Sequence, residues 1–283
     1  MNTRFYYALY NEAHGDDQVN IFQAGDYYVF TVADGVSECE LGRVASVLAC
    51  AAFEECFMER VVGQGGVDLE EVVADGVRRA GERLVNVKQI LSASQDEGSV
   101  DLVIGFVKQF IESRTWLEQT PAELISKRVD GLRERLLSTR KSGEGFTFET
   151  TLGVAVFHNY RVYTAALGDV EMYLLRRNKL FPHYVTPRGG FIDSYLSSDR
   201  GIVGAVDIAV RRLERGDVFI LASDGAYLSY APPGKYPYTL FVNQLLKSIE
   251  RGEDPAQQWL ARLRKEFGDG LPDDFSLVIV KVE

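Results

Sequence analysis

The sequence has no apolar run of the roughly 20 residues that a membrane-spanning helix needs. Its first ten residues contain one arginine and no long apolar stretch. We therefore expect neither a transmembrane segment nor a signal peptide, and we expect a soluble protein located in the cytoplasm. Cysteine is also scarce, because Cys39, Cys50 and Cys56 are the whole set and show no zinc-ligand spacing. Their odd number indicates reduced, buried thiols.

Positive charge is in short supply as well. Lysine and arginine total 31 against 41 aspartates and glutamates, which gives a formal net charge of -10 and a pI near 5.0. So acidic a chain is a poor partner for nucleic acid or for an anionic membrane. The charge fits an excess of carboxylates, most of them on the surface and some available to bind metal.

The apolar pattern predicts two kinds of secondary structure that alternate in blocks. The expected strands are residues 19–22, 27–33, 151–157, 161–166, 171–176, 179–181, 217–223 and 275–282. The expected helices are residues 41–62, 69–92, 99–113, 121–139, 239–251 and 255–267. Residues 188–204 are expected to form a glycine-rich loop.

The order of these elements indicates the fold class. Because strands, helices, strands, helices and a last strand follow one another in blocks, the βαβ alternation of a doubly wound parallel sheet is missing. Short polar turns at His158-Asn159 and Arg177-Asn178 suit antiparallel pairing. We predict an α+β protein with antiparallel sheets packed face to face and helices outside. One domain is expected over residues 1–283, with a helical elaboration around residues 63–145.

Three aspartates lie at ends of predicted strands. Asp34 and Asp224 each follow an apolar run and precede a glycine, whereas Asp273 comes just before the last strand. One such Asp-Gly pair is usually only a turn. A set of strand-end carboxylates, with a carbonyl exposed at a glycine, offers the oxygen ligands that hard cations prefer. Mg²⁺ and Mn²⁺ fit this chemistry, whereas zinc prefers the histidine and cysteine that are scarce here.

Six segments, in order along the chain, resemble five motifs of the protein phosphatase 2C family. Residues 32–36 (VADGV) and 42–46 (GRVAS) resemble its ADG…G..AS motif, and residues 150–152 (TTL) resemble its GTTL strand start. Residues 162–175 (VYTAALGDVEMYLL) are similar to ANVGDSRAYL, and residues 216–225 (GDVFILASDG) are similar to GD.LLLCSDG. Residues 273–276 (DDFS) resemble the closing DN.T. Each match is weak alone, but together they span nearly the whole chain.

The resemblance implies a four-layer α-β-β-α sandwich of two antiparallel sheets flanked by helices. It also implies a centre of two metal ions at one sheet edge. Carried over by position, Asp34 would bridge both ions and Gly35 would offer its backbone carbonyl. Asp224 and Asp273 would complete the ligands of the second ion.

Two further aspartates match the family by position. Asp17, in residues 15–18 (GDDQ), resembles the aspartate of the N-terminal R..NED motif and would bind metal directly or through water. Asp169 matches the aspartate that, with Asp224, holds a third and weaker ion. His14, three residues before Asp17, is placed to donate a proton to the leaving alkoxide. The alternative for His14 is a solvated loop histidine.

The implied activity is hydrolysis of phosphoserine or phosphothreonine in a phosphorylated protein substrate, with two or three Mg²⁺ or Mn²⁺ ions as cofactors. A water between two cations loses a proton readily and attacks phosphorus in line. The absence of a Ser-His-Asp or Cys-Arg nucleophile motif is therefore expected.

The main departure from the family concerns its phosphate-binding arginine, which lies five positions before the aspartate matched by Asp17. Glu12 occupies this position, and a carboxylate there should repel a phosphate dianion. Arg4, Arg43 and Arg188 are candidates to replace the arginine from elsewhere.

Smaller departures surround the other motifs. Ser37 and Glu38 replace a glycine pair, Glu149 replaces the glycine before the two threonines, and Val170 replaces a serine. Asp274 replaces the common asparagine, a change compatible with metal binding.

Two regions and two rival functions stay open. Residues 63–145 are expected to pack on the outer layer as an inserted helical hairpin, with a partner-docking surface as the alternative. Residues 184–204, which correspond to the flap that shapes substrate access, are short. The rivals to a protein phosphatase are a pseudophosphatase that binds phosphoproteins without hydrolysis, and a two-metal phosphatase acting on a small phosphate ester.

Overall fold

A computed structural model describes residues 2–11, 13–36, 39, 41–62, 66–94, 96–114, 122–143, 145–184, 192–226, 237–267, 271 and 273–283. Its helices are α1 (Gly42–Val61), α2 (Leu69–Ala93), α3 (Glu97–Glu112), α4 (Ala122–Ser142), α5 (Pro237–Arg251) and α6 (Pro255–Phe267). A short 3₁₀ helix, η1, covers Asp224–Ala226.

The strands form two large antiparallel sheets and one small one. The first sheet has the order β1 (Thr3–Tyr10), β13 (Phe275–Val282), β12 (Val218–Ala222), β7 (Glu171–Arg176) and β8 (Lys179–Tyr184). The second has the order β11 (Asp207–Arg212), β6 (Arg161–Leu167), β5 (Leu152–His158), β3 (Tyr27–Ala33) and β2 (Gln18–Ala24). The small sheet joins β10 (Gly201–Val203), β9 (Tyr195–Ser197) and β4 (Glu149–Thr150).

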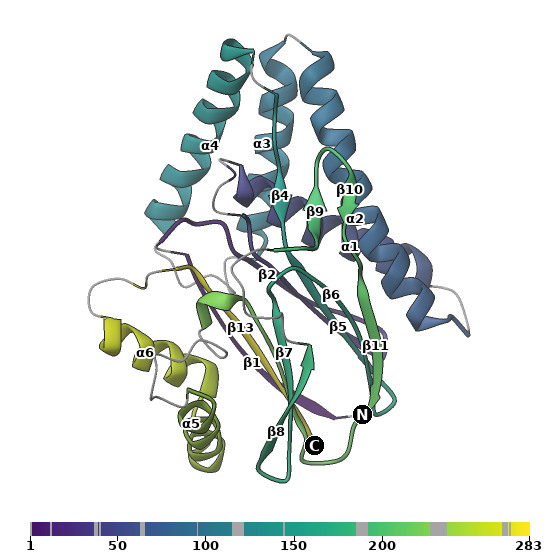
Figure 1. Cartoon of the computed structure of the whole chain (residues 1–283), viewed down its shortest axis with the longest axis vertical. Helices are drawn as coiled ribbons and strands as arrows, with labels where there is room; N and C mark the ends of the chain where they lie inside the picture. Colours follow the sequence, from purple (N-terminus) through teal and green to yellow (C-terminus); the bar gives the residue numbers. More distant parts are fainter. Residues whose placement is uncertain are drawn as a thin grey trace.

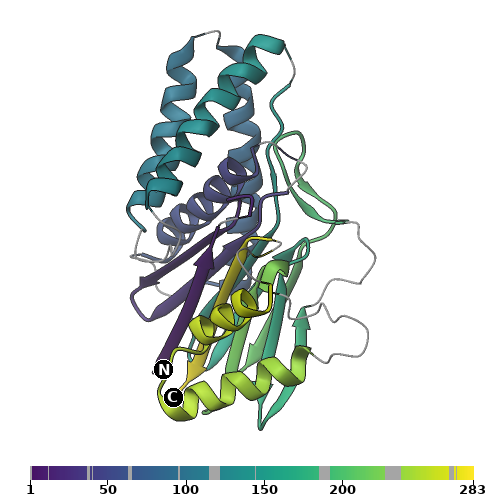
Figure 2. The same cartoon turned by 90° about the vertical axis from the view of Figure 1, so that its left-hand side faces the viewer.

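Three apolar clusters define the layers of the molecule. One cluster lies between the two large sheets and includes Phe30, Phe157 and Phe219. A second buries the outer face of the first sheet against α5 and α6, and a third buries the outer face of the second sheet against the remaining helices. Figures 1 and 2 show α5 and α6 on one side of the sheets and α1 to α4 on the other. The predicted α-β-β-α sandwich is confirmed.

The predicted hairpins are confirmed, and their turns have a clear physical cause. Asn159 and Tyr160 link β5 to β6, and Arg177 and Asn178 link β7 to β8. All four residues have positive φ, between 46° and 61°. Two consecutive residues with positive φ match the right-handed twist of the flanking strands.

Several strands were not predicted from the sequence. β1 pairs along its whole length with β13, so that Thr3 lies opposite Val282 and Tyr10 lies opposite Phe275. The glycine-rich loop expected at residues 188–204 is wrong in part, because residues 195–203 contain β9 and β10. β1 depends on pairing with a segment at the other end of the chain, and β9 and β10 have only three residues each, so none of these strands has a strong local pattern.

Helices α3 and α4 account for most of the additional helical region. They pack against each other and extend beyond the sheets beside α2 (Figures 1 and 2). Their buried faces include Val103, Val107, Leu132 and Leu136, all in the same cluster as α1 and α2. This burial fits the role expected for residues 63–145, which is packing on the outer layer. The extent of the domain, residues 1–283, stays a prediction. Pro121, expected to start α4, lies outside the described residues.

None of the helices in the described parts of the chain is long and apolar enough to span a membrane. Helix α1 illustrates the difference between a buried helix and a membrane span. It is buried on nearly every side, but it is covered by β2, β3, α2 and α3 within the protein.

Candidate active site

The aspartates predicted at strand ends lie at one edge of the sandwich. In the first sheet, Ala222 at the end of β12 pairs with Leu277 near the start of β13 and with Glu171 at the start of β7. This register places Asp224, Asp273 and Asp169 beside one another. In the second sheet, Gln18 pairs with Ala33, so Asp17 and Asp34 are neighbours.

A hydrogen bond links the two sheets at this edge. The hydroxyl of Ser223 donates to Oδ2 of Asp17 over 2.8 Å and accepts from the backbone N–H of Ser276 over 3.0 Å. Ser223 and Ser276 belong to the first sheet, whereas Asp17 precedes the second. The acidic side chains of the two sheets therefore face a common space.

The carboxylates disfavour one another's charge. Burial, together with the charges of Asp17 and Asp224, raises the pKa of Asp34 well above its usual value. Burial and the charge of Asp274 raise the pKa of Asp17 in the same way. The carboxylates therefore oppose one another's ionisation, and an opposite charge bound between them would relieve this effect.

The same effect extends across the edge. Burial and the charges of Asp169 and Asp273 raise the pKa of Asp224 to about 7. The pKa values of Asp169 and Asp273 are also raised, first by burial and then by neighbouring aspartates. Strongly shifted carboxylates in a group are a feature of functional sites.

Two oxygen atoms give a direct indication of what fits this site. Oδ1 of Asp17 and Oδ1 of Asp224 are buried and have no hydrogen-bond partner. Buried carboxylate oxygens normally accept hydrogen bonds or coordinate a cation. The donor set is entirely oxygen, which suits Mg²⁺ or Mn²⁺.

The side chains do not form a closed chelate. Among the described residues, no three His, Cys, Asp or Glu side chains converge so as to hold one metal ion. Mg²⁺ keeps several waters and uses one or two carboxylates in protein sites. An open arrangement of this kind is compatible with such an ion, although not with a dehydrated zinc site of four side chains.

Backbone contacts fix the two Asp-Gly pairs. The carbonyl of Asp34 accepts from the N–H of Thr151 and from the hydroxyl of Thr150, each over 2.8 Å, and Gly35 forms a bridge with Thr150. A Cβ atom on Gly225 would collide with the carbonyl oxygen of Asp274. Glycine at 225 thus allows the end of β12 to approach the segment before β13.

Asp274 has a role that was not predicted. Its Oδ1 accepts from the N–H groups of Ala13 and His14, over 3.0 and 3.2 Å. Its Oδ2 accepts from the N–H groups of Gly15 and Asp16, over 2.5 and 2.8 Å. Both oxygens accept from backbone donors, so Asp274 fixes the loop before Asp17.

His14 is exposed on this loop. Its charge lowers the pKa values of Asp16 and Asp273, which places its ring near the acidic edge. The exposure of His14 fits the alternative of a solvated loop histidine. Its position near the acidic edge is also compatible with proton donation, which stays a prediction.

The arginine candidates have different outcomes. The suggestion that Arg4 replaces the phosphate-binding arginine is wrong. Arg4 pairs with Glu283 near the start of β1, about 20 Å along the strand from Tyr10, which lies at the acidic end. Arg43 is buried at the start of α1, and its backbone N–H donates to Oδ1 of Asp16 over 3.1 Å. Arg188 and Glu12 lie outside the described residues, as do Ser37 and Glu38.

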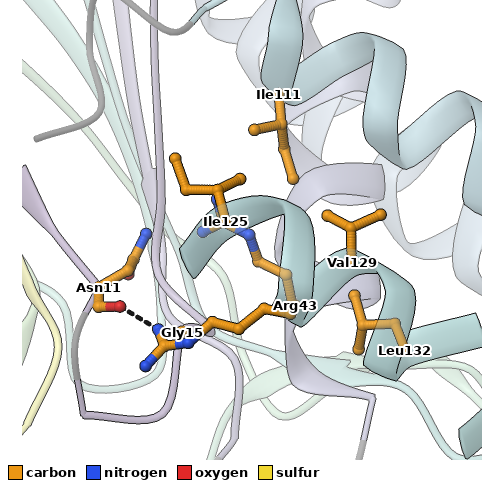
Figure 3. Close-up of a pocket in the computed structure, with 8 residues that line it drawn as sticks. Asn11, Gly15, Arg43, Ile111, Ile125, Val129 and Leu132 are labelled. Atoms are coloured by element: carbon orange, nitrogen blue, oxygen red, sulfur yellow. Dashed lines mark hydrogen bonds between the residues drawn. The ribbon is translucent and has the colours of Figure 1, made fainter. Parts of the chain in front are cut away.

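A small cavity lies beside the loop. Its volume is about 20 Å³, enough for one water molecule. Figure 3 shows Arg43, Asn11 and Gly15 around it, with apolar side chains of α3 and α4. Arg128 of α4 also lines it, and no sequence signal marked this residue.

The family model described as Protein phosphatase 2C matches residues 6–264. This match places the protein among the phosphatases, a class of hydrolases. The chain belongs to the protein phosphatase 2C family, as the motifs predicted. A comparison with curated proteins gives no significant match.

Several solved structures with the same fold come from bacteria. The serine/threonine phosphatase PstP/Ppp of Mycobacterium tuberculosis is 17% identical, with a TM-score of 0.58 and full coverage of both chains. Stp1 of Staphylococcus aureus is 14% identical, with a TM-score of 0.66 over 100% of this chain and 96% of that one. A PstP catalytic domain in complex with two manganese ions is 16% identical, with a TM-score of 0.55 and 99% coverage of each chain.

Proposed function

We propose that this protein is a metal-dependent protein serine/threonine phosphatase. The observation that carries the proposal is the pair of buried, unpartnered oxygens on Asp17 and Asp224 within a cluster of mutually repelling carboxylates. A buried acidic cluster of this kind costs stability, and binding of divalent cations would offset that cost. The family match and the manganese-bound relative support the same conclusion.

We assign the metal ligands from the motif positions. Asp34 is the proposed bridging ligand, with the carbonyl of Gly35 beside it. Asp224 and Asp273 are the proposed ligands of the second ion, and Asp17 binds directly or through water. Asp169, with Asp224, is the proposed holder of a third and weaker ion.

Bound Mg²⁺ or Mn²⁺ would supply a hydroxide at neutral pH and neutralise the phosphoryl oxygens. The chain's own residues position this chemistry. Ser223 holds Asp17 by its hydroxyl, and the two threonines hold the Asp34 backbone. His14, exposed beside the site, is the proposed donor of a proton to the leaving serine or threonine oxygen.

The proposed substrate is a phosphoserine or phosphothreonine protein. The net charge of -10 weighs against nucleic acid and anionic membrane as partners. The three cysteines are free and buried, which is compatible with the proposed cytoplasmic location.

The test is manganese-dependent hydrolysis of a phosphothreonine peptide, with an aryl phosphate and a nucleotide as parallel substrates. We expect Asp34→Ala and Asp224→Ala to lose at least about a thousandfold in kcat/KM, since several interactions with the reacting group are lost together. The matched control is Asp207→Ala, at an exposed position on β11, with activity unchanged. Full activity in both site variants would refute the assigned centre. Turnover of the nucleotide alone would assign the centre to a small phosphate ester, and metal binding without turnover would indicate a pseudophosphatase.

A further inference from the structure

The loop that carries Asp17 is held from two sides. It connects β1 to β2, and on one side Asp274 accepts hydrogen bonds from four successive backbone N–H groups. On the other side lies helix α4, which belongs to the additional helical region. Arg128 of α4 contacts this loop directly.

Arg128 contacts Asn11 and Gly15 in the described part of the loop. Its guanidinium donates to the backbone carbonyl of Asn11, the bond drawn as a dashed line in Figure 3. Its side chain also lies directly over Gly15, where an added Cβ would overlap the guanidinium and Cδ. Gly15 has a φ of +86°, a conformation that glycine adopts without strain.

Asn11 passes this contact on to Asp17. Its side-chain Nδ2 donates to the backbone carbonyl of Asp17 over 3.0 Å, and the residue is buried. Arg128 therefore holds the main chain at one end of the loop, and Asn11 ties that end to the other. The position of the Asp17 carboxylate therefore depends on a backbone that these contacts fix at residues 11, 15 and 17.

We propose that Arg128 is a positioning residue for the acidic edge, by which helix α4 sets the affinity of the site for divalent cations. The inference rests on the proposed function, because it takes Asp17 as a metal ligand. Residues that orient metal ligands typically change metal affinity or activity by 10- to 100-fold when they are removed. Arg128 would act through one loop and without contacting metal or substrate.

The anchoring of α4 supports this role. Val129 and Leu132 are 4% exposed and lie in the apolar cluster with α1 and α2, so the backbone of α4 is fixed next to Arg128. A guanidinium bonded to a carbonyl and stacked on a glycine has little freedom to leave. A rigid helix thus transmits its position to the loop.

The test compares Arg128→Ala with Arg133→Ala. Arg133 lies on the same helix but faces α3, where it pairs with Asp101 over 2.7 Å and with Glu97. Binding of Mn²⁺ is measured by calorimetry, and amide hydrogen exchange is measured over residues 11–17. We expect a roughly tenfold weaker Mn²⁺ affinity and faster exchange in the loop for Arg128→Ala. Arg133→Ala should match the parent protein, and Arg128→Lys should recover part of the affinity because one donor is restored.

Three results would overturn the inference. The first is unchanged Mn²⁺ affinity in a folded Arg128→Ala protein. The second is an increased KM for phosphopeptide at saturating Mn²⁺ with unaltered metal affinity, which would assign Arg128 to substrate binding. The third is unchanged amide hydrogen exchange over residues 11–17. This measurement tests whether Arg128 holds the loop even if the parent protein binds no Mn²⁺ and the proposed function fails. If Arg128→Ala does not fold, the same measurements on Arg128→Lys and Arg128→Gln decide the question.

Discussion

The two ends of strand β12 each carry an aspartate with a buried carboxylate oxygen, and the surroundings of the two carboxylates are opposite. Asp217, just before the strand, is 2% exposed and accepts two hydrogen bonds from Arg176, over 2.9 and 2.6 Å. It also accepts from the N–H of Glu214. Asp224, just after the strand, has an unpartnered buried oxygen and aspartates for neighbours.

The comparison separates a structural carboxylate, Asp217, from a candidate ligand residue, Asp224. Both aspartates belong to one family-like motif, residues 216–225, and sequence alone treats them alike. Folding places an arginine at one end of the strand and further carboxylates at the other. A charge that is satisfied within the chain serves stability, whereas one left unsatisfied is available to a ligand.

The largest effect is expected at the unsatisfied end. Asp34→Asn and Asp224→Asn keep side-chain volume and remove charge, so activity with Mn²⁺ should fall by at least about a thousandfold. In the presence of EDTA the same variants should have a higher Tm than the parent, because repulsion between buried carboxylates is relieved. Activity assays and thermal unfolding measure the two effects. A lower Tm in EDTA for both variants would remove the contrast between the ends of β12.

The reverse pattern is expected at Asp217. Replacement by alanine removes two hydrogen bonds of the Arg176 guanidinium, which keeps its ion pair with Glu214, and should cost about 2–3 kcal/mol of unfolding free energy because Asp217 is buried. The variant should keep its kcat at saturating Mn²⁺ in the folded fraction. Urea unfolding gives the stability change. A loss of kcat without a loss of stability would show that Asp217 belongs with the site.

The pH dependence of stability in EDTA sharpens the same contrast. The pKa of Asp224 is about 7 in the folded protein against 3.8 when unfolded, and that of Asp16 is about 6. The folded state then binds more protons between these values, so stability falls as pH rises from about 4 to about 7. The shift in the pKa of Asp224 limits the contribution of this one group to the loss of stability to about 4 kcal/mol.

We expect the Tm in EDTA to decline by several degrees between pH 5 and pH 8, and the decline to be smaller in Asp224→Asn. Mn²⁺ should raise the Tm more at pH 8 than at pH 5, since cations compete with protons for the carboxylates. A Tm in EDTA that rises steadily over this range would contradict the raised pKa values.

The smallest effect is expected at Asp274. Asparagine has one acceptor oxygen in place of two, so two of the four loop N–H groups lose their partner in Asp274→Asn, at a cost of about 1–3 kcal/mol. Mn²⁺ affinity should fall while the Tm changes by a few degrees. Asp207→Asn, with the same change of charge on an exposed strand, is the control. Unaltered Mn²⁺ affinity would show that the loop keeps its position without Asp274.

The elements with strong local patterns were predictable. α2 was expected at residues 69–92 and runs from Leu69 to Ala93, because Asp68 caps its first N–H groups and its apolar residues recur at helical spacing. β12 was expected from its apolar run. β1 was not, because its partner β13 lies at the other end of the chain, and β9 and β10 were not, because three residues are too few for an alternating pattern.

The sequence predicted which residues belong to the candidate site, but it did not predict the contacts that hold them in place. The motifs named the strand-end aspartates, but the choice between Arg4, Arg43 and Arg188 had no local signal. Arg128 and Asp274 act through a loop more than a hundred residues away from either, as the separations of their bonds show. Such contacts depend on how helices and sheets pack, which a single sequence does not encode locally.

The hydroxyl of Ser223 also makes the acidic edge sensitive to shear. It bonds the residue that follows β12 to Asp17, which precedes β2, and O–H···O hydrogen bonds keep their heavy atoms within about 3.0 Å. A shift of one sheet against the other by about an ångström would exceed this distance and break the bond. The same shift would change the spacing between the carboxylates of the two sheets.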